Sequence, residues 1–123
     1  MQLTVLPQSD LPLYRQLYEQ IAVQVLNGTL LPNEALPSIR FLASELKIGT
    51  VTVRNAYDAL EADGYLYTQQ GSGCFVATLS DEQREERIRT LLFPALTDPV
   101  QKAKQAGIRE ETLLAFVRQL YRS

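Results

Sequence analysis

The residues with the most specific chemistry lie between Gly49 and Asn55, where hydroxyl, guanidinium and amide side chains follow one another. A guanidinium such as that of Arg54 can pair bidentately with guanine, and the amide of Asn55 can pair in the same way with adenine. A methyl group of threonine or valine, such as those of Thr50, Val51 and Thr52, can contact the methyl group of thymine. The alternative is an ordinary solvated helix face, so the pattern needs a structural context before it indicates base recognition.

Two further groups of residues could contact a polyanion. Ser38 and Arg40 stand at the expected start of a helix, where free backbone amides and a guanidinium favour a phosphate group. The run Gln70, Gly71, Ser72 and Gly73 could let the backbone approach DNA closely or could simply form a turn. This run neither opens a helix nor carries a lysine, which disfavours a nucleotide-phosphate loop.

The chain of 123 residues has no histidine and one cysteine, which narrows the chemistry further. Without histidine there is no Ser-His-Asp or Cys-His arrangement and no histidine-containing metal site. One cysteine can form neither an internal disulfide nor a four-cysteine zinc site. Cys74 has no basic sequence neighbour to favour its thiolate, so a small buried side chain is expected rather than a redox switch. We therefore expect no enzyme activity, no metal and no cofactor.

The composition is that of an ordinary globular protein, with 46% hydrophobic and 21% charged residues. The opening residues Met1 to Thr4 lack the basic and apolar regions of a signal peptide. Nowhere does the chain hold about 18 successive uncharged apolar residues, the length needed to cross a bilayer. These features predict a small soluble protein of the cytoplasm with no membrane partner.

Helical periodicity predicts the element that precedes the candidate contacts. The apolar spacing of three and four residues is formed by Tyr14, Leu17, Tyr18, Ile21 and Val25. Asp10 and Pro12 are the expected cap and first-turn proline, and Asn27-Gly28 is the expected stop. In the connector that follows, Pro32-Asn33 predicts a tight turn in which Asn33 takes a positive φ.

Two short helices then carry most of the candidate contacts. Ser38 is the expected N-cap of the second helix and Thr50 that of the third, which stops at Gly64. The expected buried positions are Ile39, Leu42, Ala43 and Leu46 in the second helix and Val53, Ala56, Tyr57 and Leu60 in the third. This leaves outward Thr50, Val51, Thr52, Arg54 and Asn55. Two such helices joined through Gly49 predict a helix-turn-helix, whose second helix enters the major groove of DNA.

A β-hairpin is expected directly after these helices. Residues 65–69 and 74–78 are rich in aromatic and β-branched residues and flank the glycine-rich run at 70–73. The fold class is therefore mostly α with a small hairpin, a winged helix-turn-helix domain over residues 1–78. With a hairpin in this place, the base-contact interpretation of the third helix becomes the favoured one.

Residues 79–123 are expected to form a short helical dimerisation region. A charged helix start follows Ser80 or Asp81, the proline residues Pro94 and Pro99 interrupt the pattern, and Thr97-Asp98-Pro99 indicates a fresh helix start. These segments have no core of their own, so their apolar faces should pack on the first domain or, preferably, on a second copy of the chain. The expected dimer contacts are Ile88, Leu91, Leu92, Leu113, Leu114, Val117, Leu120 and Tyr121.

The charge of the chain does not by itself indicate a nucleic-acid partner. The whole chain has 12 basic and 14 acidic residues, a net charge of −2. Residues 1–78 carry four basic and seven acidic side chains, yet from Leu36 to Asn55 three basic residues face a single acidic one. Because salt screens charges beyond about 8–10 Å, this local excess matters more than the total. The local excess of basic residues is compatible with phosphate contact but does not by itself indicate it.

Taken together in order and spacing, these residues resemble the GntR family of bacterial transcription regulators over residues 10–78. The resemblance is carried by Pro12, Tyr14, Ile21, Gly28, Leu30, Pro32, Leu36-Pro37-Ser38, Arg40, Leu42-Ala43, Thr52-Val53, Ala56-Tyr57, Leu60, Gly64, Gly71, Gly73 and Phe75-Val76. The short tail is similar to that of the YtrA-type subfamily, since some 45 residues cannot enclose the large effector-binding or aminotransferase-like domain of other branches.

The resemblance implies DNA contacts at Arg40, at Thr50, Thr52 and Arg54, and at the wing tip 70–73. Two departures matter, because the family often has arginine where Thr50 stands and arginine or lysine where Ser72 stands. Without these side chains the operator preference of relatives cannot be transferred. Asn33 replaces a common glycine, which is harmless if the turn requires a positive φ.

We therefore expect a homodimeric repressor that binds a palindromic operator in double-stranded DNA. Whether a small-molecule effector is a further partner, and which one, the sequence does not indicate. The alternative is a winged-helix module that binds a protein through Val51 or the tail, in keeping with the negative net charge.

Overall fold

The computed structural model describes all residues from Met1 to Ser123 and divides them into two compact units, Met1–Arg84 and Glu85–Ser123. The first unit begins with helix α1 (Leu13–Leu26), which buries the predicted residues Leu17, Tyr18 and Ile21. The prediction of Asp10 as cap is wrong, because the N-cap is Pro12 and no side chain caps the helix. The extended backbone of Pro12 places its own carbonyl to accept from the Arg15 and Gln16 amides, so the helix starts beyond the reach of Asp10.

The turn between α1 and α2 follows the predicted local chemistry. Asn33 has φ 67°, and the Glu34 amide donates to the Leu31 carbonyl at 3.0 Å. Helix α2 (Ile39–Leu46) starts as predicted at Ser38, whose hydroxyl accepts from the Phe41 amide at 3.1 Å. A serine oxygen in this position satisfies one of the free amides at the helix start.

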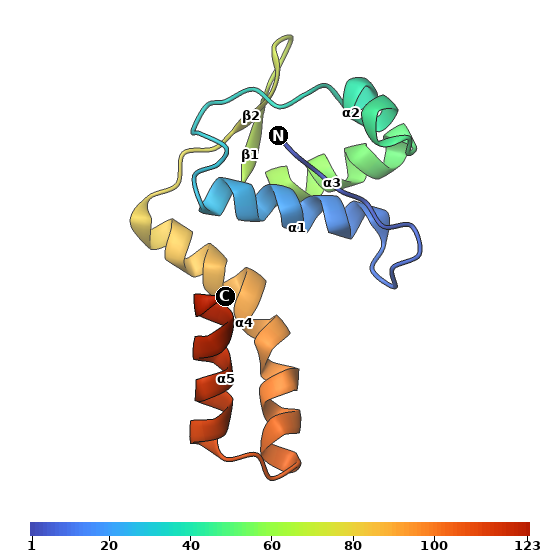
Figure 1. The fold of residues 1–123 in the computed structure, drawn as a ribbon. Coiled ribbons are helices and arrows are strands. Elements are labelled where there is room, and N and C mark those ends of the chain that lie inside the picture. The colour runs from blue at the N-terminus through green and yellow to red at the C-terminus, as the bar shows by residue number, and fades with distance from the viewer. The chain divides into compact units, whose positions relative to one another are not determined.

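Helix α3 (Thr50–Ala62) packs against both α1 and α2 and forms the centre of the first unit (Figure 1). Its predicted stripe of Val53, Ala56, Tyr57 and Leu60 is buried, with Val53 and Leu60 fully covered. The prediction of Thr50 as cap is wrong by one residue. Gly49 has the extended backbone of an N-cap, so Thr50 is already helical and its hydroxyl makes no capping bond.

The predicted hairpin consists of β1 (Leu66–Gln69) and β2 (Gly73–Val76), which pair antiparallel from Leu66↔Val76 to Gln69↔Gly73. This confirms a mostly helical winged helix-turn-helix fold. The sequence did not indicate that β2 has a second backbone partner. The connector before α2 binds its outer edge, since the Leu36 amide donates to the Cys74 carbonyl and the Val76 amide donates to the Glu34 carbonyl, both at 2.9 Å. Strand β2 therefore has backbone hydrogen bonds on both edges, to β1 and to the connector.

The second unit contains most of α4 (Asp81–Gln105) and all of α5 (Glu110–Arg122), which run antiparallel (Figure 1). The start of α4 is a reciprocal capping box, because the Ser80 hydroxyl accepts from the Gln83 amide and the Gln83 side chain accepts from the Ser80 amide. Neither α4 nor α5 contains a buried residue. No helix of the structure combines the length and apolarity that crossing a bilayer requires.

Whether the tail helix is continuous or broken at its prolines was left open by the sequence. In the structure α4 continues through both Pro94 and Pro99, so no fresh helix starts at Thr97-Asp98-Pro99. Each proline removes one amide donor, which leaves the carbonyl four residues earlier without its helical partner. Those carbonyls belong to Thr90 and Ala95, which are exposed, so solvent can satisfy them. The Thr97 hydroxyl also donates to the Phe93 carbonyl at 3.0 Å within this stretch.

An extended strap before α1, residues 2–6, is held by three glutamines spaced four residues apart on the helix. The Gln16 amide group accepts from the Leu6 N–H at 2.8 Å and donates to the Leu6 carbonyl at 3.0 Å. Gln20 makes the same pair of bonds with Thr4, and Gln24 donates to the carbonyl of Gln2. The glutamines are four residues apart on the helix, a rise of about 6 Å, and their partners are two residues apart in the strap, a rise of about 6.7 Å. Successive glutamines therefore lie opposite successive partners.

We predict that Gln16→Leu lowers the free energy of unfolding by about 1–3 kcal/mol, because it leaves backbone groups of the strap without partners. Gln16 is 7% exposed and also donates to the Leu11 carbonyl at 2.8 Å. Chemical denaturation gives the free energy, and hydrogen exchange should show a faster Leu6 amide. The control is Gln8→Leu, the same substitution at an exposed position between the strap and α1. Unchanged stability and unchanged exchange in Gln16→Leu would contradict the role of the glutamines.

Candidate nucleic-acid interface

The outward face of α3 is fixed by the burial of its opposite side. Successive helical residues are turned by about 100°, so positions three, four and seven apart share one face. The buried stripe of α3 described above faces α1. The opposite face carries Val51, Arg54, Asn55 and Asp58, all of them exposed. Thr50 and Thr52 lie on its two flanks, and Thr52 is half-buried.

This geometry refines the expected contact set. Arg54 and Asn55 lie where the sequence placed them, side by side on the exposed face, and Arg54 forms none of the ion pairs in the structure. Val51, whose methyl groups the sequence already offered as a contact for thymine, lies on this face, whereas Asp58 was not predicted there. The signal for Asp58 was available in the angular spacing, since it lies opposite the buried stripe.

A cleft of about 390 Å³ joins the start of α2 to the wing. Its walls include Ser38 and Arg40 on one side and Ser72 and Gly73 on the other. The structure therefore brings these four predicted residues together. The other six, which do not line the cleft, are Thr50, Thr52, Arg54, Asn55, Gln70 and Gly71. The Tyr57 hydroxyl donates to the Pro37 carbonyl at 2.8 Å, which fixes the segment before α2 against α3.

Two acidic side chains, Asp58 and Glu61, line the same cleft. The Thr68 hydroxyl donates to Glu61 Oε2 at 2.8 Å, linking α3 to β1. Cys74 also lines the cleft and is half-buried. Burial raises the pKa of the Cys74 thiol, and the charge of Glu61 raises it further. Both effects favour the neutral thiol, so the geometry gives no support to a thiolate at this position.

Within the wing tip, residues 70–72 form the loop between β1 and β2. The Ser72 amide closes this loop by donating to the Gln69 carbonyl at 2.9 Å. Gly71 has φ 81° and Gly73 has φ 113°. A side chain at either glycine would meet no atom of this chain within 4 Å, so the backbone conformation rather than crowding calls for glycine. The tip is exposed throughout and open to an approaching partner.

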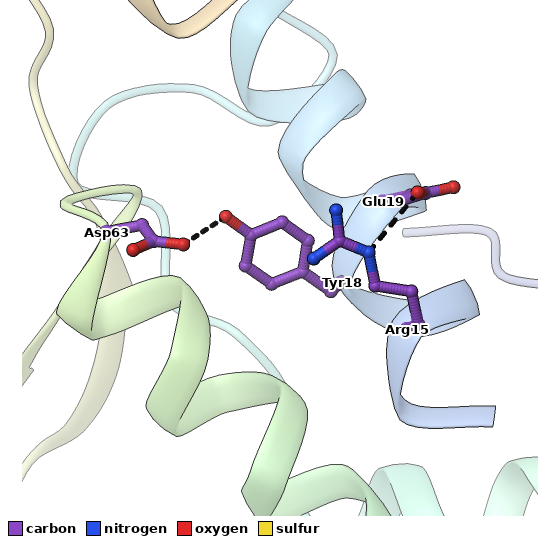
Figure 2. Close-up of polar contacts among 4 residues, drawn as sticks. All are labelled: Arg15, Tyr18, Glu19 and Asp63. Carbon is purple, nitrogen blue, oxygen red and sulfur yellow. Dashed lines mark hydrogen bonds and ion pairs between the residues drawn. The ribbon is translucent and has the colours of Figure 1, made fainter. Parts of the chain in front are cut away.

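The junction between α3 and the wing is held by a cluster from α1 and the end of α3 (Figure 2). The Tyr18 hydroxyl donates to the carboxylate of Asp63, the residue that ends α3. The Arg15 guanidinium lies 4.8 Å from the centre of the Tyr18 ring and pairs with Glu19 at 3.3 Å. Tyr65, the first residue beyond the Gly64 turn, meets the Tyr18 ring edge-on. The angle at which the wing leaves α3 is thereby tied to α1.

A second surface lies in the unit Glu85–Ser123, where the predicted dimer residues fall into two groups. Exposed members are Leu92, Leu114, Val117, Leu120 and Tyr121, and half-buried members are Ile88, Leu91 and Leu113. Five further large exposed apolar side chains were not among the predicted dimer contacts, namely Phe93, Leu96, Val100 and Phe116 in the helices and Ile108 between them. The spacing of three and four residues in each helix was the available signal for the first four. Without a buried residue, this helix pair leaves an unusually large apolar surface in water.

We predict that stability falls as the pH rises above about 10, the ordinary pKa of tyrosine. Burial first, and then the hydrogen bond to Asp63, raise the pKa of Tyr18, and burial raises the pKa of Tyr57. The folded state thus favours the neutral phenols, so their contribution is complete below the ordinary pKa and is lost as the pH climbs past it.

Chemical denaturation between about pH 8 and 11 measures this loss, because it spans the ordinary tyrosine pKa. Tyr18→Phe and Tyr57→Phe should each make the alkaline decline shallower, whereas Tyr121→Phe, at a position 88% exposed, should leave it unchanged. A decline of equal steepness in all three variants would assign it to other groups.

Comparison with known proteins gives one family match. The model of the gntR family of bacterial regulatory proteins matches residues 13–76. The chain is 30% identical to an uncharacterised HTH-type transcriptional regulator of Bacillus subtilis, YhcF, over 90% of this chain and 91% of that protein. It is 29% identical to the HTH-type transcriptional repressor YtrA of the same organism, over 93% and 88%. The probable rhizopine catabolism regulatory protein MocR of Rhizobium meliloti is 45% identical over 58% of this chain, which spans only 14% of that protein.

Solved structures agree with this match. A GntR family transcriptional regulator from Listeria monocytogenes superposes with a TM-score of 0.75 at 27% identity, covering 91% of this chain and 97% of that one. The DNA-binding domain of AraR in complex with operator ORX1 superposes with a TM-score of 0.56 at 34% identity. That likeness covers 63% of this chain and 99% of the AraR domain.

Proposed function

Because the chain belongs to the gntR family of bacterial regulatory proteins, we propose that it represses transcription by binding a specific operator as a homodimer. It is a DNA-binding transcription regulator. The observation that carries the proposal is the exposed face of α3 with Arg54 and Asn55, which have no role in the core and stand beside a wing. A protein that acts on the chromosome of a bacterium works in the cytoplasm.

In this proposal, α3 lies in the major groove and the surrounding elements contact the backbone. Arg54 pairs with a guanine and Asn55 with an adenine, while Thr50 and Thr52 add contacts from the flanks. The backbone contacts come from Ser38 and Arg40 and from the wing tip, residues 70–73. These positioning contacts carry no sequence information, so discrimination rests on α3. The likeness to the AraR domain with its operator supports this arrangement.

The proposal of a homodimer rests on the second unit, because apolar side chains of α4 and α5 are left exposed in a single copy of the chain. A second copy covers them through a two-fold interface in which each chain presents the same surface. Two winged helix-turn-helix domains related in this way bind a palindromic operator, and the dimer sets the spacing of the two half-sites. The boundary between head and dimerisation region is proposed at residues 78 and 79.

The alternative of a protein-binding winged helix draws on one observation, the placement of Asp58 on the outward face of α3. A carboxylate there repels phosphates, although it can also accept from the amino group of cytosine. A protein of this kind would show no affinity for DNA at low salt.

We predict that Arg54→Ala and Arg40→Ala weaken operator binding in different ways. Loss of the Arg54 base contact should cost about 1–3 kcal/mol and relax the preference at one base pair, whereas loss of the Arg40 phosphate contact should weaken all sequences alike. Fluorescence anisotropy with the operator and with single-base variants separates the two effects. Arg89→Ala, in the second unit, is the control. Wild-type affinity and preference in Arg54→Ala would overturn the assignment of α3 as the reading helix.

We also predict that Leu120→Asp converts the dimer to a monomer, because it puts a charge at an apolar position 56% exposed on α5. Sedimentation velocity measures the change, and operator affinity should fall by a factor on the order of 10² or more once the two heads are no longer linked. Gln119→Asp, an exposed neighbour off the apolar face, should remain a dimer. A dimeric Leu120→Asp would place the interface elsewhere.

A further inference from the structure

The reading face of α3 has an apolar side chain at its N-terminal end. Val51 is the second residue of the helix, and 63% of it is exposed. It shares the outward face with Arg54 and Asn55, three and four residues further along. It lies opposite the buried stripe, so the packing of the first unit does not account for a valine at this position.

The neighbours of Val51 restrict what this side chain can recognise. Arg54 and Asn55 are hydrogen-bonding groups suited to guanine and adenine, and they bring the same face to the edges of bases in the major groove. In that groove thymine alone presents a methyl group, at its C5 position. An exposed branched apolar side chain in line with two base-reading groups therefore complements thymine and no other base.

We propose, building on the DNA-binding function above, that Val51 selects thymine in each half-site by packing its methyl groups against the C5 methyl group. The contact distinguishes thymine from cytosine at a position that neither Arg54 nor Asn55 reads. The first turn of the reading helix then recognises purines by hydrogen bonds and a pyrimidine by apolar contact.

Other methyl groups close to this face are the competing candidates. Thr50 and Thr52 each carry one, but they lie on the flanks, and Thr52 is half-buried. Phe41 is 58% exposed but belongs to α2, the helix that precedes the reading helix. Position on the face thus favours Val51, and each threonine methyl group can be removed separately by a serine substitution that keeps the hydroxyl.

The experiment uses the full chain and duplexes that differ by one methyl group. A preferred duplex is first enriched from random DNA with the wild-type protein. Each thymine of the half-site is then replaced by deoxyuridine, which removes the C5 methyl group and keeps every hydrogen-bonding group. Affinities of the wild type, Val51→Ala and Thr50→Ser are measured for each duplex by fluorescence anisotropy.

We expect one thymine per half-site at which deoxyuridine weakens wild-type binding roughly fourfold, the effect of burying one methyl group. Val51→Ala should bind the thymine and uracil duplexes equally at that position, and Thr50→Ser should keep the wild-type difference. Alanine is the better helix former, so folding does not limit the Val51→Ala variant. Leu31→Ala, which removes an equally exposed apolar side chain outside α3, should also keep the difference.

Three outcomes would overturn the inference. If deoxyuridine has no effect at any position, the protein does not read the methyl group, although its DNA binding stands. If the effect persists in Val51→Ala and disappears in Thr50→Ser, the flank rather than the centre of the face reads thymine. If no sequence is enriched over random DNA, the proposed function fails, and the inference fails with it.

Discussion

The one-sided burial of α3 is the constraint on which the other features depend. Val53, Ala56, Tyr57 and Leu60 pack toward α1 and α2, and helical geometry then fixes which residues face outward. A hydrophobic stripe of this kind is strongly favoured, because each large apolar side chain contributes about 1.5–3 kcal/mol when buried. The proposed DNA-reading face is therefore not an independent feature of the sequence. It is the side of the helix that the core leaves free.

The elements around α3 convert that free face into a defined surface. Tyr18 ties the end of α3 to α1, and the connector before α2 pairs with the outer edge of the wing. The reading helix and the wing tip are thus held by separate sets of contacts within one unit. Because the first 78 residues carry more acidic than basic side chains, non-specific attraction to DNA is weak. In the proposed dimer, affinity then depends on well-placed contacts and on linking two DNA-binding domains through the second unit.

Local chemistry made much of this fold predictable, and non-local contacts set the limit. Ser38 was predicted as a cap, and Ser80 was one of two candidates, because a hydroxyl at a helix start acts within three residues. The continuity of α4 through Pro94 was not predicted, since solvent can replace the lost helical bond at an exposed site. The glutamine contacts to the strap, such as that of Gln16, join segments ten residues or more apart and leave no periodic apolar signal. In the candidate site, helical spacing already placed Val51 outward, whereas Asp58 on the same face was not predicted.

The central claim is that the outward face of α3 reads a DNA sequence, and the ratio of two affinities tests it most directly. The full chain is titrated with an enriched duplex and with a scrambled duplex of the same composition. A specific regulator should bind the enriched duplex about 10³-fold or more tightly than the scrambled one. Both affinities should fall with salt, by about 10³ or more between about 50 and 200 mM if six to ten phosphates are contacted. Equal affinity for the two duplexes, or affinity independent of salt, would contradict the account.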